Sequence, residues 1–284
     1  MAVRALIIAI ENYPQVQVGG IAKSLPGTLQ AGLDFKAWLV EKWKAEGRLE
    51  NDTQLIFCSD PAQPGCSGAS AEDIRSALLK LKDDGQGATE ELYLFFSGHG
   101  FSFVEKPGSR ADIVIASDFK EPALSGNSCL NLDAMIAWLR DHLGTGRHYY
   151  FVDACRNKLN ASQIVIGSLL PIDPQASGEA STYVLQSTVD GAVAAADGAF
   201  NAALLAGLRG KGKAKTWSSQ VNDAMFVRYD SLRGYLVKLL ATKQKITHKS
   251  EGSDDQSDAI LATLRPVPEI KCTIAIDDAP TPLD

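Results

Sequence analysis

The sequence is poor in the features that would indicate a metal site, a disulfide framework or a membrane span. Its 284 residues include five cysteines and four histidines. No two cysteines form a C-x-x-C pair, which argues against a structural zinc site. The odd number of cysteines, irregularly spaced, favours free thiols in a reducing compartment. No apolar run approaches the roughly 20 residues that a membrane span requires. We therefore expect a cytoplasmic protein with no metal, no other cofactor and no membrane partner.

Positive charge is also scarce. The chain carries 28 Lys and Arg against 34 Asp and Glu, a net charge of −6. General nucleic-acid binding needs clustered Lys and Arg to displace counterions, so a direct nucleic-acid partner is not expected. The amino-terminal stretch MAVRALIIAIENY lacks a small-residue cleavage site and fits a buried first strand better than a signal peptide. A composition of 45% hydrophobic and 22% charged residues is that of an ordinary globular protein.

Short apolar runs bounded by turn residues are typical of strands buried on both faces of a parallel sheet. Five runs fit this description: 5–10, 54–58, 92–96, 149–152 and 183–186. A weaker sixth candidate lies at 272–276. Four amphipathic stretches of helical spacing lie between or after them: 29–44, 71–81, 132–143 and 200–208. This alternation predicts a doubly wound α/β fold with a mostly parallel sheet of about six strands and helices on both faces.

The domain limits follow from composition. We assign residues 1–270 to one domain and residues 271–284 to a last strand or a linker toward a further domain, because IDDAPTPLD has two prolines and no apolar pattern. Residues 242–257 (TKQKITHKSEGSDDQS) have the composition of a mobile surface loop. Residues 101–131 carry a strand or hairpin arm at 113–117.

Two strand ends carry side chains suited to nucleophilic catalysis. Ligands of open parallel sheets bind beyond the carboxyl ends of the strands. The segment LYLFFSGHG carries His99 just after its apolar run, and HYYFVDACRN carries Cys155 in the same position. If the two strands are neighbours, about 5 Å separates their backbones, and thiol and imidazole face one cleft. His148 lies seven residues before Cys155 on the same strand, roughly 20 Å or more away, which is too far for it to act on the thiol. His142 lies near the carboxyl terminus of a predicted helix, where a positive charge is favourable, so a structural role is expected for it.

A Cys–His pair can perform acyl transfer. The imidazole deprotonates the thiol or pairs with its thiolate, and later protonates a leaving amine. The backbone N–H groups of Gly100 and Cys155 are the candidate oxyanion hole, typically worth about 3–4 kcal/mol per donor. Three other cysteines, Cys58, Cys129 and Cys272, are expected in the core, and Cys66, in a Pro/Gly loop, is expected to be exposed.

The segments FFSGHG and FVDACRN, with His99 and Cys155 56 positions apart, resemble the caspase-like peptidases. This group contains caspases, metacaspases and bacterial caspase-like proteins, among them CHAT-type proteases. The resemblance spans about residues 4–209 and includes ALIIAIENY, LPGTLQAGLDFKAWL and TYVLQSTVDGAVAAADGAFNAALLAGL. It implies a caspase-like fold and a cysteine endopeptidase that acts on proteins or peptides. It also implies a regulated defence or stress effector with a sensor or regulatory partner.

Two positions depart from the family's patterns. Asp153 stands where animal caspases have Gln, and the resulting DAC is closer to metacaspases and bacterial relatives. By that resemblance Asp153 lines the first substrate pocket and favours a basic P1 residue. Ala31 stands where metacaspases usually have an acid, so their calcium dependence is not implied here.

Three alternatives remain open from the sequence. The chain could be a catalytically silent caspase-like scaffold that binds partners. It could also be a cysteine amidase that acts on small amides. Asp153 could simply accept hydrogen bonds from backbone N–H groups at the end of its strand.

Overall fold

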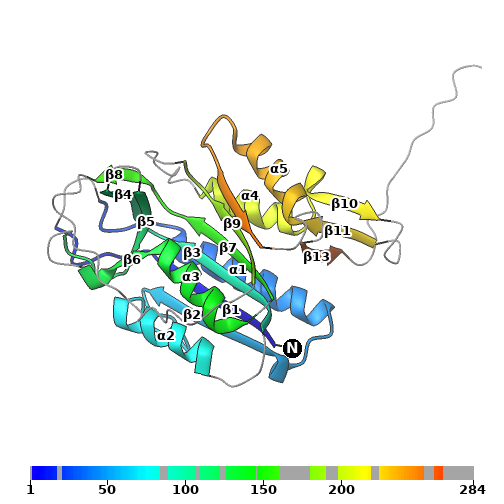
Figure 1. Cartoon of the computed structure of the whole chain (residues 1–284), viewed down its shortest axis with the longest axis horizontal. Coiled ribbons are helices and arrows are strands. Elements are labelled where there is room, and N and C mark those ends of the chain that lie inside the picture. The colour runs from blue at the N-terminus through cyan, green and yellow to red at the C-terminus, as the bar shows by residue number, and fades with distance from the viewer. Residues whose placement is uncertain are drawn as a thin grey trace, which may run out of the picture.

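The centre of the molecule is a six-stranded sheet with the order β12-β9-β7-β3-β1-β2 (Figure 1). The computed structural model describes residues 2–17, 21–83, 89–106, 109–121, 126–144, 146–159, 180–189, 198–218, 224–252 and 259–264. The strands are β1 (Ala2–Ile10), β2 (Thr53–Asp60), β3 (Thr89–Ser97), β7 (Arg147–Asp153), β9 (Ser181–Gln186) and β12 (Thr247–Glu251). The first five pair in parallel and contain the five predicted runs, whereas β12 pairs antiparallel with β9.

Helices cover both faces of this sheet. One face packs against α2 (Ala71–Asp83) and α3 (Leu132–Leu143). The other packs against α1 (Thr28–Ala45), α4 (Ala199–Leu208) and α5 (Tyr229–Leu240) (Figure 1). Successive strand residues point to opposite faces, so in β1 Leu6 and Ile8 join the first core while Ile7 and Ala9 join the second. The doubly wound α/β prediction is confirmed.

The second core contains a row of tyrosines that crosses the sheet. Tyr93 on β3, Tyr149 on β7, Tyr183 on β9 and Tyr229 on α5 stand in contact, with successive ring centroids 5.2, 5.3 and 5.0 Å apart. Such ring pairs add specific contacts to the free energy of apolar burial. The row fixes β3 and β7, which carry the candidate dyad, against α5.

Two smaller sheets flank the central one. A four-stranded sheet, β6-β5-β4-β8, consists of β4 (Gly100–Lys106), β5 (Ser109–Ile115), β6 (Cys129–Asn131) and β8 (Asn157–Leu159). It lies at the carboxyl ends of β3 and β7, and β5 includes the start of the arm predicted at 113–117 (Figure 1). A three-stranded sheet, β10-β11-β13, lies toward the opposite end and was not predicted; its strands are β10 (Lys215–Ser218), β11 (Ala224–Arg228) and β13 (Ile260–Leu264).

The surface loop predicted at 242–257 is wrong in its central part, because β12 occupies Thr247–Glu251. Its sequence, THKSE, has no apolar residue, but as an edge strand it needs only backbone pairing with β9 on one side. Lys249 Nζ lies 2.9 Å from Asp133 Oδ1, and Arg140 Nη1 lies 3.3 Å from Glu251 Oε2. These pairs tie the polar strand to α3.

Several predictions fall outside the described residues. The sixth strand candidate at 272–276, Cys272 and the boundary at 271 all lie there. Across the described part of the chain, every helix is too short or too polar to cross a bilayer.

Candidate active site

The strands that precede His99 and Cys155 are parallel neighbours. In the register of β3 and β7, Ser97 lies opposite Asp153. Just beyond the strand ends, the Gly98 N–H donates a hydrogen bond of 3.1 Å to the Asp153 carbonyl. His99 and Cys155 each stand two residues past this register pair. The topology therefore brings the two predicted residues to the same edge of the sheet.

Two segments near the amino terminus hold the imidazole of His99. The His99 backbone N–H donates to the Tyr13 hydroxyl at 2.8 Å, and the two ring centroids are 4.7 Å apart. His99 Nε2 lies 2.8 Å from the Ala22 carbonyl oxygen. Because a carbonyl only accepts, Nε2 carries the proton in this contact and Nδ1 retains its lone pair.

Electrostatics favour a neutral imidazole at this site. Burial lowers the pKa of His99, and the hydrogen bond to Ala22 offsets part of that effect. Burial also raises the pKa of Tyr13; the hydrogen bond from His99 opposes this, and the negative charges of Asp60 and of a Cys155 thiolate add to it. Cys155 is thus within electrostatic reach of the side chain that packs on His99.

The cysteines differ in how far their side chains are exposed to solvent. Cys58 and Cys129 are fully buried, as predicted, and burial raises the pKa of each thiol to about 12. A thiol of that pKa supplies almost no thiolate at neutral pH. Cys66 and Cys155 are partly exposed. Within the described residues, only these two thiols combine a free sulfur with access to solvent.

Gly100 lies directly against the backbone of Cys155. A Cβ atom at this position would come within 2.8 Å of the Ile113 carbonyl oxygen and 2.9 Å of the Cys155 carbonyl oxygen. No side chain fits there without moving backbone, so glycine is required for the close approach. The two N–H groups predicted to form an oxyanion hole thus come from contacting segments.

Asp153 is held by a residue that the sequence analysis missed. Asn201 on α4 donates from Nδ2 to Asp153 Oδ2 at 2.7 Å and to Ser97 Oγ at 3.4 Å. Asn201 is only 5% exposed. Its signal in the sequence is a single polar residue in an otherwise apolar helix, AFNAALLAGL. Ala31, by contrast, is buried in the apolar core on α1.

A second buried network holds Arg156, the residue after Cys155. Arg156 donates from Nη2 and Nε to Asp112 Oδ1 at 2.7 and 2.8 Å, and from Nη1 to Thr247 Oγ1 at 3.2 Å. Gln186 Nε2 donates to the other oxygen of Asp112 at 3.1 Å. The nucleophile's loop is thereby tied to β5, β9 and β12.

His148 and His142 are placed as predicted, whereas His248 lies in strand β12 and not in a loop. His148 is fully buried near the amino end of β7, level with Leu92 of β3, and its Nδ1 lies 3.3 Å from the Tyr150 hydroxyl. His142 Nδ1 lies 2.9 Å from the Trp138 carbonyl oxygen near the end of α3. Neither lies at the sheet edge that carries Cys155.

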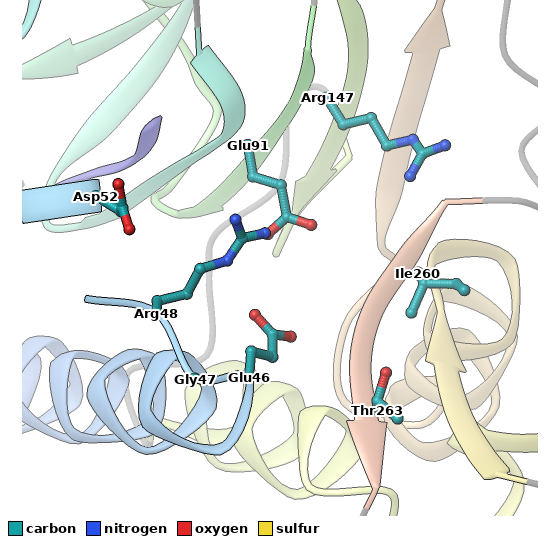
Figure 2. A pocket seen from close by; sticks show the side chains of 8 residues that line it. All are labelled: Glu46, Gly47, Arg48, Asp52, Glu91, Arg147, Ile260 and Thr263. Carbon is teal, nitrogen blue, oxygen red and sulfur yellow. The ribbon is translucent and has the colours of Figure 1, made fainter. Parts of the chain in front are cut away.

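A pocket of about 440 Å³ opens at the opposite, amino end of the sheet. Figure 2 shows that charged side chains of both signs face it, from the segment that follows α1, from β3 and from β7. Arg48 is bound to Glu90 at 2.8 Å, and Glu91 accepts from Lys42 at 3.0 Å. These four charges form two ion pairs, and no cysteine or histidine is among the residues that line the pocket.

The fold and the two strand ends define a class of protein: an α/β peptidase fold in which a histidine and a cysteine follow adjacent parallel strands. The caspase-domain model of peptidase family C14 matches residues 2–251, and the chain belongs to that family.

Known proteins of similar sequence or fold agree with this assignment. A protein named as a probable protease from a Desulfuromonadales bacterium is 27% identical over 252 residues, which are 80% of this chain and 28% of that protein. The chain thus spans about a quarter of the length of this relative.

Two crystal structures share the fold. One, of a Geobacter sulfurreducens protein, has a TM-score of 0.61 at 16% identity and covers 95% of this chain and 100% of that chain. The other, caspase-1 from Spodoptera frugiperda, has a TM-score of 0.52 at 12% identity and covers 88% of this chain and 85% of that chain.

Proposed function

We propose that this chain is a cysteine endopeptidase in which Cys155 is the nucleophile and His99 its proton donor and acceptor. The observation that carries the proposal is the pairing of β3 with β7, which delivers both side chains to one edge of the sheet. Membership of the caspase-domain family supports it.

The surroundings of His99 suggest how the proton moves. Since Ala22 engages Nε2–H at 2.8 Å, Nδ1 is the nitrogen that exchanges a proton with the thiol. The Cys155 sulfur attacks the peptide carbonyl, and the imidazolium then protonates the departing amine. Water hydrolyses the resulting thioester, with the same imidazole as base. The N–H groups of Gly100 and Cys155 stabilise the oxyanion in both steps.

We further propose a basic P1 residue. Asp153 stands two positions before the nucleophile at the carboxyl end of β7. Its carboxylate is held by the neutral Asn201 amide at 2.7 Å, so this contact does not neutralise its charge. A charge-assisted hydrogen bond to Arg or Lys is worth about 1.5–3 kcal/mol, which corresponds to roughly tenfold to hundredfold in kcat/KM.

The cellular setting is also part of the proposal. We place the peptidase in the cytoplasm, as a regulated defence or stress effector that works with a sensor or regulatory domain or protein. The length of the probable protease from Desulfuromonadales, of which this chain matches 28%, supports additional domains in that relative.

The cysteines offer a matched test of the nucleophile. Wild type, Cys155→Ala and Cys66→Ala are incubated with a fluorogenic peptide library and, separately, with iodoacetamide. We expect Cys155→Ala to lose all cleavage and the fastest alkylation, and Cys66→Ala to keep both. Full cleavage by Cys155→Ala would refute the assignment. Hydrolysis of amino-acid amides but not of peptides by wild type would identify an amidase instead.

The P1 assignment is tested with substrates that differ only at P1, carrying Arg, Lys, Asp or Leu. Wild type should prefer Arg and Lys, and Asp153→Asn should lose that preference. A preference for Asp or Leu would contradict the assignment, as would an Asp153→Asn variant that still prefers basic residues.

A further inference from the structure

Asn201 lies in the core with an unused acceptor. Both of its Nδ2 contacts are donations, to Asp153 Oδ2 at 2.7 Å and to Ser97 Oγ at 3.4 Å. Its Oδ1 is fully buried and has no hydrogen-bond partner. Most buried polar atoms in proteins are satisfied, so an exception near the sheet edge where ligands of parallel sheets bind calls for a physical explanation.

The alternative amide orientation does not remove the problem. If Oδ1 and Nδ2 were exchanged, the amide oxygen would lie 2.7 Å from the Asp153 carboxylate, where both atoms are acceptors. The donor contact to Asp153 therefore fixes which atom is left over. The remaining atom, Asn201 Oδ1, is an acceptor that belongs to the same amide group as the donor to the Asp153 carboxylate.

The chemistry of this cluster selects its ligand. Asp153 and Asn201 together present acceptor atoms at the carboxyl end of β7, two residues before Cys155. A guanidinium carries five N–H donors and an ammonium three, and neither accepts a hydrogen bond. A neutral amide can donate to these acceptors but does not offset the negative charge of Asp153, and an acidic side chain is repelled by that charge.

We propose that Asn201 is a specificity-determining residue for a basic P1 side chain. Its Nδ2 aims the Asp153 carboxylate, and its Oδ1 accepts a second hydrogen bond from the substrate's guanidinium or ammonium. This inference rests on the proposed function and adds to it a residue from α4, 46 positions beyond the nucleophile (155 to 201).

The test uses a substrate pair that isolates the charged donors. Peptides with P1 arginine and P1 citrulline have nearly the same shape, but citrulline is neutral and has an oxygen in place of one nitrogen. The ratio of their kcat/KM values is measured for wild type, Asn201→Leu, Asn201→Asp and Asp153→Asn. Asn131→Ala is the matched control, because Asn131 caps α3 by accepting from the Ala134 N–H at 3.0 Å, away from this cluster.

We expect Asn201→Leu to lower the arginine-to-citrulline ratio about tenfold, the usual effect of one hydrogen bond to a charged group. Asn201→Asp should keep or raise the ratio and shift the acid limb of its pH profile upward, because two adjacent carboxylates oppose each other's ionisation. A purely structural role for Asn201 would impair both variants alike and leave the shape of the pH profile unchanged. Asn131→Ala should lower Tm but leave the ratio at its wild-type value.

The outcomes distinguish a failure of the role of Asn201 from a failure of the basic P1 assignment on which it rests. If wild type favours arginine and Asp153→Asn loses that preference, a folded Asn201→Leu that keeps the wild-type ratio overturns the role of Asn201 and leaves the proposed function standing. If Asn201→Leu does not fold, Asn201→Asp decides: an unchanged ratio and an unchanged pH profile overturn the inference. If wild type shows no preference for arginine, the P1 assignment itself fails, and the role of Asn201 fails with it.

Discussion

The two ends of the central sheet use charge in different ways. At the amino end of β3 and the neighbouring carboxyl end of α1, charged groups are matched: Lys42 binds Glu46 at 2.8 Å and Glu91 at 3.0 Å. At the carboxyl ends, Arg156 and Asp112 form a buried pair, and the Asn201 amide that holds Asp153 has an oxygen without a hydrogen-bond partner. Matched pairs stabilise the fold, whereas a buried polar atom without a partner costs stability. The carboxyl ends thus combine a stabilising pair with a polar atom that, under the proposal above, a ligand satisfies.

Two histidines show the same contrast. His99 and His148 both have a pKa lowered by burial. His99 follows the carboxyl end of β3, where Nε2 lies 2.8 Å from the Ala22 carbonyl oxygen and Nδ1 retains its lone pair. His148 lies near the amino end of β7 with no exposed surface. Burial alone therefore does not mark a catalytic histidine; its position on the strand does.

The largest effect is expected for His99. His99→Ala should lower kcat/KM by at least a hundredfold, because general acid–base groups contribute about 10²–10⁴ in rate. Tm should change little, since the side chain is partly exposed. The matched control is His142→Ala on α3, which should retain full activity. A His99→Ala enzyme with more than about a hundredth of wild-type kcat/KM would remove His99 from the mechanism.

Next comes the buried pair beneath the nucleophile. Asp112→Ala leaves the Arg156 guanidinium without its carboxylate, and the two side chains are only 13% and 6% exposed in the intact pair. Breaking such a pair typically costs about 3–5 kcal/mol. Urea unfolding should show this loss, and activity should fall as the loop shifts. The double variant Asp112→Leu/Arg156→Met should recover most of the stability; equal stability of Asp112→Ala and wild type would show that the pair is not structural.

An acid-dependent loss of stability should come from His148. Burial, aided by the positive charge of Arg140, lowers its pKa to about 4. An unfolded histidine titrates near 6.5, so between these values the unfolded state binds more protons and stability falls as pH falls. The full loss, reached near pH 4, is about 3 kcal/mol.

This contribution is isolated by comparing urea unfolding of wild type and His148→Asn at several pH values from 7 to 4. The difference in unfolding free energy between the two proteins should change in favour of the variant as the pH is lowered. Parallel curves over the whole range would exclude His148 as a source of acid sensitivity.

The smallest effect is expected at the amino-end surface. Glu90→Gln removes the pair with Arg48, whose side chains are 35% and 24% exposed. The hydrogen bond from Arg48 lowers the pKa of Glu90, so any stabilisation is present above the unfolded pKa and is lost as pH falls through the folded one. Solvent screening limits such a pair to about 0–1 kcal/mol. Catalysis should be unaffected, and a loss of more than about 2 kcal/mol would contradict the contrast between the two ends.

What the sequence could predict depended on apolar patterning. The five parallel strands were found because burial on both faces requires continuous apolar runs. β12 was missed because an edge strand such as THKSE satisfies its backbone through one neighbour and needs no apolar side chain. The strands of the β10-β11-β13 sheet were missed as well. Two of them, β11 and β13, pair with each other although a long stretch of chain separates them.

The candidate site was predictable only in part. His99 and Cys155 follow strands whose pairing the alternation of elements implies. Their supporting residues come from elsewhere in the chain: the carbonyl of Ala22 lies 77 positions from His99, and Asp112 lies 44 positions from Arg156. No local sequence pattern predicts such contacts, because they form only when the sheet assembles.

The link between Arg156 and Thr247 has a consequence for biosynthesis. Thr247 opens β12, which is synthesised after the other five strands of the central sheet. A nascent chain on the ribosome would already contain both His99 and Cys155 before it could form the 3.2 Å bond from Arg156 to that strand. The loop beside the thiol therefore gains its last support only when the caspase domain, residues 2–251, is almost completely translated. Strand order thus delays the last support of the loop that carries Cys155 until β12 has been synthesised.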